Sequence, residues 1–201
     1  MEDLVLGLLT GAVFGLASLP VARMPKPRLF WGSAWVDPTG VSWVVGFLLF
    51  GPVSALTGSA VGTLGIWKTS PEPTPALGAA LKFLGTTCLW LTVATVVTVF
   101  WDGRYPPQQL NSFQMAVGLT LLGGLVRAAV MIPLGYFYSI PYYRSHQEKR
   151  RVTRTEAVAE FGGVARYVIV LTLFNVWLSL FDLLVPWIAL YPTGLAQALT
   201  M

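Results

Sequence analysis

The chain alternates between long apolar stretches and short polar or proline-rich connectors. The apolar stretches cover residues 4–22, 40–51, 53–67, 76–101, 113–140 and 164–190. A helix needs about 20 apolar residues to cross the hydrocarbon core of a bilayer, and the longer stretches reach that length. The pattern predicts an all-α integral membrane protein, with six transmembrane helices forming a single transmembrane domain over residues 1–201.

The second and third stretches are separated only by Gly51-Pro52. A proline inside a helix removes one backbone hydrogen bond and clashes with the preceding turn. We therefore expect a Gly-Pro break between two short helices rather than one straight span over residues 40–67.

The connectors carry most of the polar residues. Residues 68–75 contain three prolines, and 102–112 are rich in turn-forming residues. The most polar segment is 144–160, whose charged residues are Arg144, Glu148, Lys149, Arg150, Arg151, Arg154, Glu156 and Glu160. Tryptophan and tyrosine gather near the ends of the apolar stretches, where aromatic side chains usually meet the membrane interface.

Composition supports a membrane location. Charged residues make up 11% of the chain, against about 25% in an ordinary soluble domain. So few charges could not cover the surface of a soluble fold of this size, which excludes a soluble enzyme or a disordered chain. The net charge of +4 comes from basic residues between apolar stretches, so we expect no nucleic-acid partner. We expect a multi-pass protein of the cell membrane, with the lipid bilayer as its surroundings, whose first stretch is a mature helix and not a cleaved signal peptide.

Catalytic chemistry has little basis in the sequence. Cys88 is the single cysteine and lies in an apolar stretch. One cysteine alone excludes an internal disulfide or a cysteine-based metal site within the chain. The single histidine, His146, lies in the basic segment, and no metalloprotease, nucleophile-elbow or phosphate-loop motif occurs. We predict no enzymatic activity, no metal and no cofactor.

Lys82, Arg127 and Asp182 are ionisable residues that lie within predicted spans. Such a group costs at least about 2.5 kcal/mol at the bilayer centre unless it is paired or hydrated. Lys82 or Arg127 could reach the interface along its own alkyl chain, and Arg127 could form a structural pair with Asp182. The alternative to these structural explanations is that Lys82, Arg127 or Asp182 has a functional role.

Glycines recur at four-residue spacing in the first stretch, at Gly7, Gly11 and Gly15. This spacing puts all three on one helix face, where the missing side chains allow another helix to approach closely. That helix could belong to the same chain or to a different subunit.

Several short motifs, in order along the chain, resemble those of the substrate-binding S components of energy-coupling factor (ECF) vitamin transporters, and the riboflavin-type branch is the most similar. Each motif is weak alone, and the resemblance lies in their order and spacing over nearly the whole chain. The motifs are Asp37-Pro-Thr-Gly, Gly46-Phe-Leu-Leu-Phe-Gly51-Pro52 with Gly58 and Gly62, Tyr136-Phe-Tyr-Ser-Ile-Pro141-Tyr142, and Leu173-Phe174-Asn175.

The resemblance implies a non-catalytic solute carrier with six helices. Such a subunit would bind a vitamin-like small molecule and deliver it by toppling in the membrane, driven by two ATPase subunits through a transmembrane T subunit. Gly7, Gly11 and Gly15 match the face that the family presents to the T subunit. The pocket would lie among the first outer loop, the Pro-rich loop and the last three helices. The substrate-binding candidates are Trp35 and Asp37 in the first loop, Lys82 as a charge partner, Tyr138 and Tyr142 as stacking faces, and Asn175 as a hydrogen-bonding amide.

Two positions depart from the riboflavin pattern. The family's asparagine before Tyr-Phe falls at Gly135, and its lysine after Phe-Asn falls at Leu178. Both side chains are expected to hydrogen-bond the flavin ring, so their replacement removes polar groups that orient a ligand in an apolar pocket. Riboflavin and another small heterocycle are both open as substrates.

Two arguments predict opposite orientations of the chain in the membrane. The family's topology puts both termini in the cytoplasm, which leaves most basic loops outside, whereas the positive-inside rule predicts the reverse. The helix count could differ by one, the rule could fail here, or the basic loops could attract an anionic substrate.

Two other functions suit the same sequence. An assembly or scaffold subunit of a larger membrane complex would need the glycine faces and no ligand. A channel or secondary carrier would be favoured by an inverted repeat, and the sequence contains none that we can detect.

Overall fold

The structure is a computed structural model that describes residues 2–24, 39–69 and 111–198, together with the isolated positions 76, 80, 83, 84 and 87. Every regular element in these residues is helical, which confirms the all-α prediction for this part of the chain. The predicted helix over 76–101 lies almost entirely outside the described residues. The elements are α1 (Glu2–Ala22), α2 (Thr39–Phe50), α3 (Pro52–Thr69), α5 (Phe113–Leu134), the π-helix η2 (Gly135–Ser139), α6 (Ile140–Glu148), α7 (Arg154–Ala159), α8 (Val164–Leu190) and α9 (Leu195–Ala198).

Three helices are long and apolar enough to cross a membrane: Asp3–Ala22, Phe113–Tyr142 and Val164–Leu190. Their outward faces carry leucine, valine and isoleucine side chains; Leu9, Val13, Leu125 and Leu173 are among those more than half exposed. Apolar side chains in such number on helix exteriors match a lipid environment and not water. The structure therefore indicates a multi-pass membrane protein.

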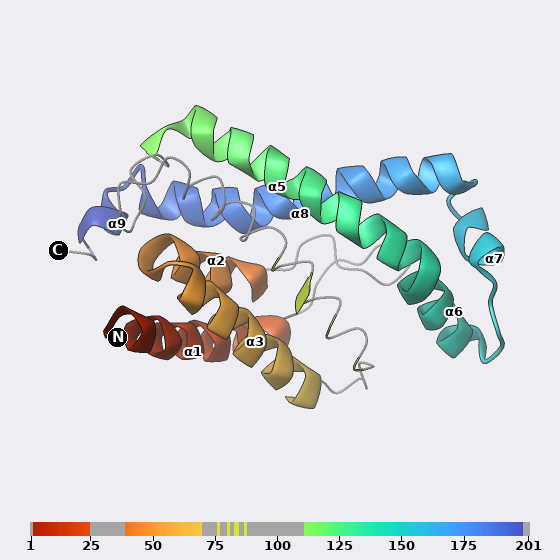
Figure 1. Cartoon of the computed structure of the whole chain (residues 1–201), viewed down its shortest axis with the longest axis horizontal. Coiled ribbons are helices and arrows are strands. Elements are labelled where there is room, and N and C mark those ends of the chain that lie inside the picture. Colours follow the sequence, from red (N-terminus) through yellow and green to blue (C-terminus); the bar gives the residue numbers. More distant parts are fainter. Residues whose placement is uncertain are drawn as a thin grey trace.

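The chain turns between α2 and α3 at the predicted break. Gly51 has a φ of 86°, in the left-handed region that a glycine adopts without strain. Pro52 then starts α3, a position where its missing N–H costs no helical hydrogen bond. The two helices fold back on each other at this corner (Figure 1).

α1 packs lengthwise and in parallel against α3. Gly7 faces Val53, Gly11 faces Ser54 and Thr57, and farther along the pair Gly62 of α3 faces Ser18 of α1. Both helices therefore run in the same direction (Figure 1).

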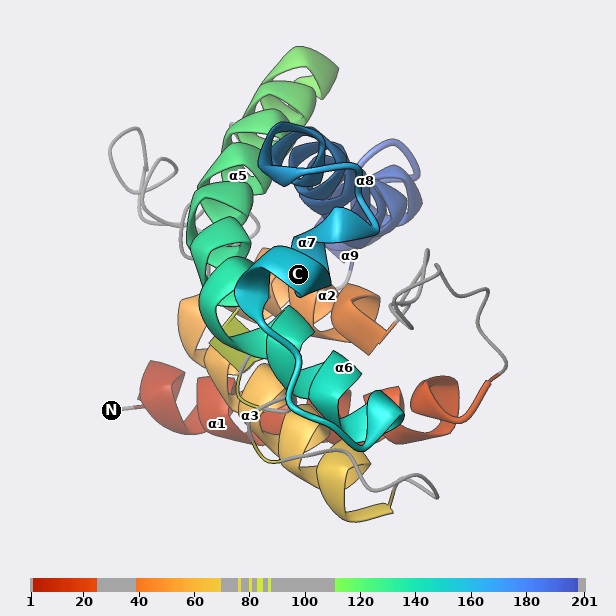
Figure 2. The same cartoon turned by 90° about the vertical axis from the view of Figure 1, so that its right-hand side faces the viewer.

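α5 and α8 form a second pair, crossing above the first (Figures 1 and 2). They run antiparallel, because Phe113 meets Trp187 at one end and Gly135 meets Tyr167 at the other. The main core lies where α2 packs between the two pairs, and its buried side chains are Val44, Phe47, Leu48, Leu49, Ala55, Ala116, Leu119, Leu183, Trp187, Leu190 and Tyr191.

The fifth predicted helix continues beyond its expected end at residue 140. The helix runs from Phe113 through a π turn at Gly135–Ser139 and onward to Glu148. It is about 50 Å long at 1.5 Å per residue, which exceeds the hydrocarbon thickness of about 30 Å. The polar end of α6 therefore extends past the apolar part of the bundle. The last predicted helix, 164–190, has the same bounds as α8.

Candidate functional site

A buried ion pair joins the two long helices. The Arg127 guanidinium of α5 donates to the Asp182 carboxylate of α8, with 3.1 Å between Nη1 and Oδ2. The two side chains are 12% and 6% exposed. This is the structural pair that the sequence left open as one interpretation of the two residues. Because each charge lies within an apolar span, neutralisation by the other lowers the cost of keeping both there.

Asp182 belongs to a polar stripe on α8, which we define as Asn175, Ser179 and Asp182. The intervals of four and three residues place these side chains on one helix face, and all three are buried. This spacing was visible in the sequence, although the sequence interpretation singled out only Asn175 and Asp182. Ser179 is the member that it missed.

Glycines bring neighbouring helices against the polar stripe. A Cβ atom on Gly40 of α2 would lie 2.8 Å from the Asp182 carboxylate, and one on Gly124 of α5 would lie 3.3 Å from the Ser179 Cβ. α2, α5 and α8 therefore meet at the stripe. Within the described residues, the buried Nε of Arg127 and Oγ of Ser179 have no hydrogen-bond partner.

Of the predicted ligand-binding residues that the structure describes (Tyr138, Tyr142 and Asn175), Asn175 lies inside the bundle. It is 4% exposed, and its Nδ2 donates to the Leu171 carbonyl one turn earlier, at 2.7 Å. The amide retains a second N–H and its carbonyl oxygen for other partners. Its position makes Asn175 a possible polar contact for a molecule held between the helices.

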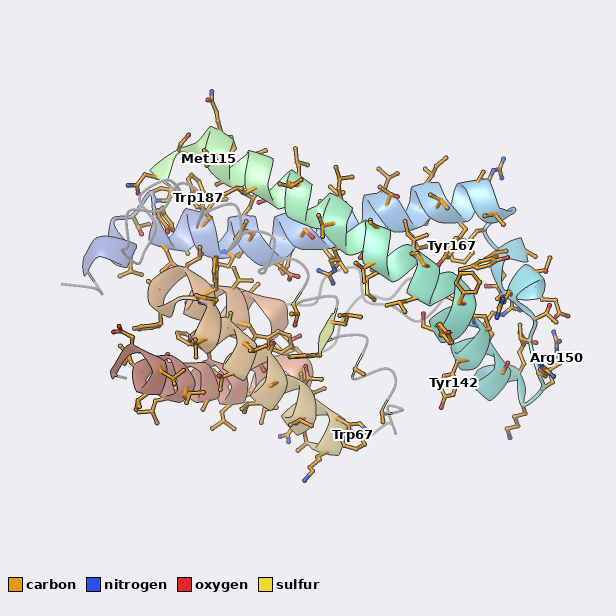
Figure 3. The ribbon with its side chains drawn as sticks, viewed as in Figure 1. Trp67, Met115, Tyr142, Arg150, Tyr167 and Trp187 are labelled. Atoms are coloured by element: carbon orange, nitrogen blue, oxygen red, sulfur yellow. The ribbon has the colours of Figure 1, made fainter. Side chains whose placement is uncertain are left out.

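Tyr138 and Tyr142 lie elsewhere. They are 58% and 41% exposed and come from η2 and α6, at the end of the molecule where the chain turns toward α7 (Figure 3). Asn175 is buried on the inner face of α8, so the described structure does not bring Tyr138, Tyr142 and Asn175 together in one site. The exposed tyrosine rings are typical of aromatic residues that lie at the membrane interface at the end of a span.

Trp35, Asp37 and Lys82 lie outside the described residues. Their assignment to a first-loop wall, a polar contact and a charge partner therefore remains a prediction.

The glycine face of α1 is filled by the same chain. A Cβ atom on Gly7 would lie 2.9 Å from the Val53 Cβ, and one on Gly11 or Gly15 would lie 2.5 or 2.8 Å from a backbone carbonyl of α3. Contact with a helix of the same chain thus accounts for these three glycines. Docking of a T subunit on α1 remains a prediction, and it would have to use the exposed leucine and valine face of the helix.

The two departures from the riboflavin pattern have structural reasons. A Cβ atom at Gly135 would collide with the Tyr167 hydroxyl, which donates a 2.7 Å hydrogen bond to the Ile132 carbonyl. An asparagine there would therefore have to displace the Tyr167 hydroxyl and its hydrogen bond. Leu178 is 8% exposed on α8, where a lysine would bring a charge into the packed interior. Sequence comparison alone showed the substitutions but not the packing behind them.

Comparison with known proteins adds no family. No family model, no curated protein and no solved structure matches this chain. Among the described residues, no group of three or more His, Cys, Asp or Glu side chains lies in a position to hold a metal ion.

Proposed function

We propose that this chain is the membrane-embedded, solute-binding subunit of an ECF-type transporter, and that it takes up a vitamin-like small molecule. The buried Asn175 supports this proposal most directly. It occupies the position of the resemblance's Phe-Asn motif and lies on a polar stripe within an otherwise apolar span. Polar side chains in transmembrane segments are rare and generally serve a site or a helix contact.

The proposed role divides the work among several chains. Asn175 would orient the solute by hydrogen bonding, while apolar surroundings supply most of the contact area. The Arg127–Asp182 pair would keep α5 and α8 in register around it. A transmembrane T subunit and two ATPase subunits would supply the energy, and riboflavin or a related heterocycle would be the cargo.

Ligand retention tests the proposal. The protein is purified in mild detergent and its small-molecule content is measured by mass spectrometry and visible absorbance. We expect a stoichiometric heterocyclic ligand in the wild type and at least a ten-fold lower occupancy in Asn175→Leu. Co-purification of two ATPase subunits would further support the assembly.

A matched control is available one turn away. Thr172 also donates to the carbonyl four residues earlier on α8, at 2.8 Å, but it faces outward. Thr172→Val removes the same kind of hydrogen bond without touching the polar stripe, so it should keep the ligand. Equal ligand loss in both variants, or a wild type without ligand, would contradict the proposal.

The second candidate is an assembly or scaffold subunit with no ligand of its own. The Arg127–Asp182 pair favours this alternative, because it accounts for both of these intramembrane charges without a ligand. A ligand-free protein that co-purifies with other membrane subunits would support it.

A further inference from the structure

The end of the molecule where α6, α7 and α8 meet holds an ordered ion-pair network. Arg144 pairs with Glu148 at 2.6 Å and with Glu160 at 3.2 Å. Arg150 pairs with Glu148 at 2.7 Å and with Glu156 at 3.3 Å. All three glutamates of this region are thereby engaged with two arginines.

Hydrogen bonds fix the backbone between α6 and α7. Thr153 and Glu156 form a capping box at the start of α7, each accepting from the other's backbone N–H. The Ser145 hydroxyl accepts from the N–H of Val152 at 2.8 Å, and Arg144 donates to the Glu156 carbonyl at 2.8 Å. These bonds give the connection, which we name the basic hairpin (residues 144–160), a defined shape.

Three cations of the basic hairpin, Lys149, Arg151 and Arg154, are exposed and have no acidic partner in the part of the chain that the structure describes. Arg166, just beyond the hairpin on α8, is a fourth. Arg154 instead lies over the Phe137 ring, 4.7 Å from its centroid. The hairpin thus carries cations without a carboxylate partner, whereas each of its three glutamates is paired with an arginine.

The position of the basic hairpin points to a membrane surface. It follows directly on the candidate span Phe113–Tyr142 and precedes the span Val164–Leu190. The exposed aromatic side chains of Phe137, Tyr138 and Tyr142 come from η2 and α6, directly before the basic hairpin, and Figure 3 shows Tyr142 and Arg150 at the same end of the molecule. Aromatic residues at the end of a span typically meet the lipid headgroups. Lipid phosphates would therefore lie within reach of the arginines.

We propose that the basic hairpin binds the headgroups of anionic phospholipids. Arginine and lysine recognise phosphate through charge-assisted hydrogen bonds, and basic segments beside spans attract anionic lipids. The pairing of Glu148, Glu156 and Glu160 with Arg144 and Arg150 matters because it offsets the negative charge that would repel a phosphate. The proposal concerns this end of the bundle and is independent of the transport function.

Native mass spectrometry of the detergent-purified full chain tests this surface. The protein is mixed with equal amounts of phosphatidylglycerol and phosphatidylcholine, and the bound lipids are counted. We expect phosphatidylglycerol to be retained preferentially, and we expect Lys149→Gln/Arg151→Gln to lower that preference by about five-fold for each removed charge.

The matched control removes two exposed cations from other helices. Arg23 follows α1 and Lys68 lies in the last turn of α3, so neither belongs to the basic hairpin, and both are exposed. Arg23→Gln/Lys68→Gln should keep most of the preference. The absence of any preference in the wild type, or an equal loss in both double variants, would overturn the proposal. Solute retention measured on the same samples should not change, which separates this test from that of the transport function.

Discussion

At the scale of single residues, the spans contain side chains whose roles depend on partners far away in sequence. Arg127 and Asp182 are 55 positions apart, and each is a partner of the other in a buried ion pair. Gly135 likewise packs against Tyr167. The sequence predicted that Arg127 and Asp182 are unusual and named their pairing as one option, because charge in an apolar stretch is visible without a structure. It could not predict the Tyr167 contact, because no local pattern links a helix glycine to a tyrosine on another helix.

A double-mutant cycle tests the ion pair. Arg127→Leu or Asp182→Leu alone should lower the free energy of unfolding by about 3–5 kcal/mol, because each leaves an opposite charge buried without its partner. The double variant should lose less than the sum of the two. Unfolding by denaturant titration in detergent micelles measures all four proteins, and additive losses would show that the pair contributes nothing as a pair.

Replacement of Gly11 tests the close contact of α1 with α3. In Gly11→Ala the new Cβ would lie 2.5 Å from the Ser54 carbonyl oxygen, and backbone atoms cannot rotate away. We expect a loss of about 1–3 kcal/mol in the free energy of unfolding, since the helices must separate. Gly118→Ala is the control, because no atom lies within 4 Å of its Cβ position and alanine favours helix. Equal stability of the two variants would contradict this packing.

At the scale of elements, the helix boundaries agree with the prediction where the sequence signal is strong. The Gly51-Pro52 corner and the bounds of α8 lie where the apolar pattern placed them. The continuation of α5 through η2 into α6 was not predicted, because the expected helix was bounded by the apolar stretch 113–140. The π turn ends two residues before Pro141, and a π turn or a proline is a typical place for a long helix to bend.

The capping box of α7 makes the basic hairpin sensitive to pH. Hydrogen bonds from the Thr153 backbone and hydroxyl lower the pKa of Glu156 below its ordinary value of 4.5, with a smaller contribution from Arg150. A lowered folded-state pKa gives stability that is present above pH 4.5 and is lost as the pH falls through the folded-state value. The hairpin should therefore loosen in acid.

Hydrogen exchange of the amides of residues 153–158 measures this effect. The wild type should be more protected than Glu156→Gln at pH 6, and the difference between the two proteins should close toward pH 3. Comparing the proteins at each pH cancels the titration of Glu148 and Glu160, which both retain. A difference that persists at pH 3 would show that ionisation of Glu156 does not order the hairpin.

At the scale of the whole molecule, charge is distributed unequally along the helices. The described basic residues other than Arg127 lie at or just after the C-terminal ends of α1, α3 and α6, in the basic hairpin and at the start of α8. Figure 1 shows the basic hairpin at the right of the molecule and the starts of α1 and α5 and the end of α8 at its left; we call these the basic end and the opposite end. The sequence predicted which loops are basic, but only the helix directions show that α1, α3 and α5 all run toward the basic end.

The S-component account requires a definite orientation of this asymmetry. It places both termini in the cytoplasm and the basic end outside, whereas the positive-inside rule places the basic end in the cytoplasm. The two arguments make opposite predictions for the same residues. Membrane orientation is therefore the property that tests the proposed function most directly.

Cysteine labelling in intact cells tests it most directly. In a Cys88→Ser background, Lys149→Cys marks the basic end and Asn111→Cys, just before α5, marks the opposite end. The account predicts that a membrane-impermeant maleimide labels Lys149→Cys in intact cells and labels Asn111→Cys only after permeabilisation. The reverse pattern would place the termini outside and would contradict the assignment as an ECF solute-binding subunit.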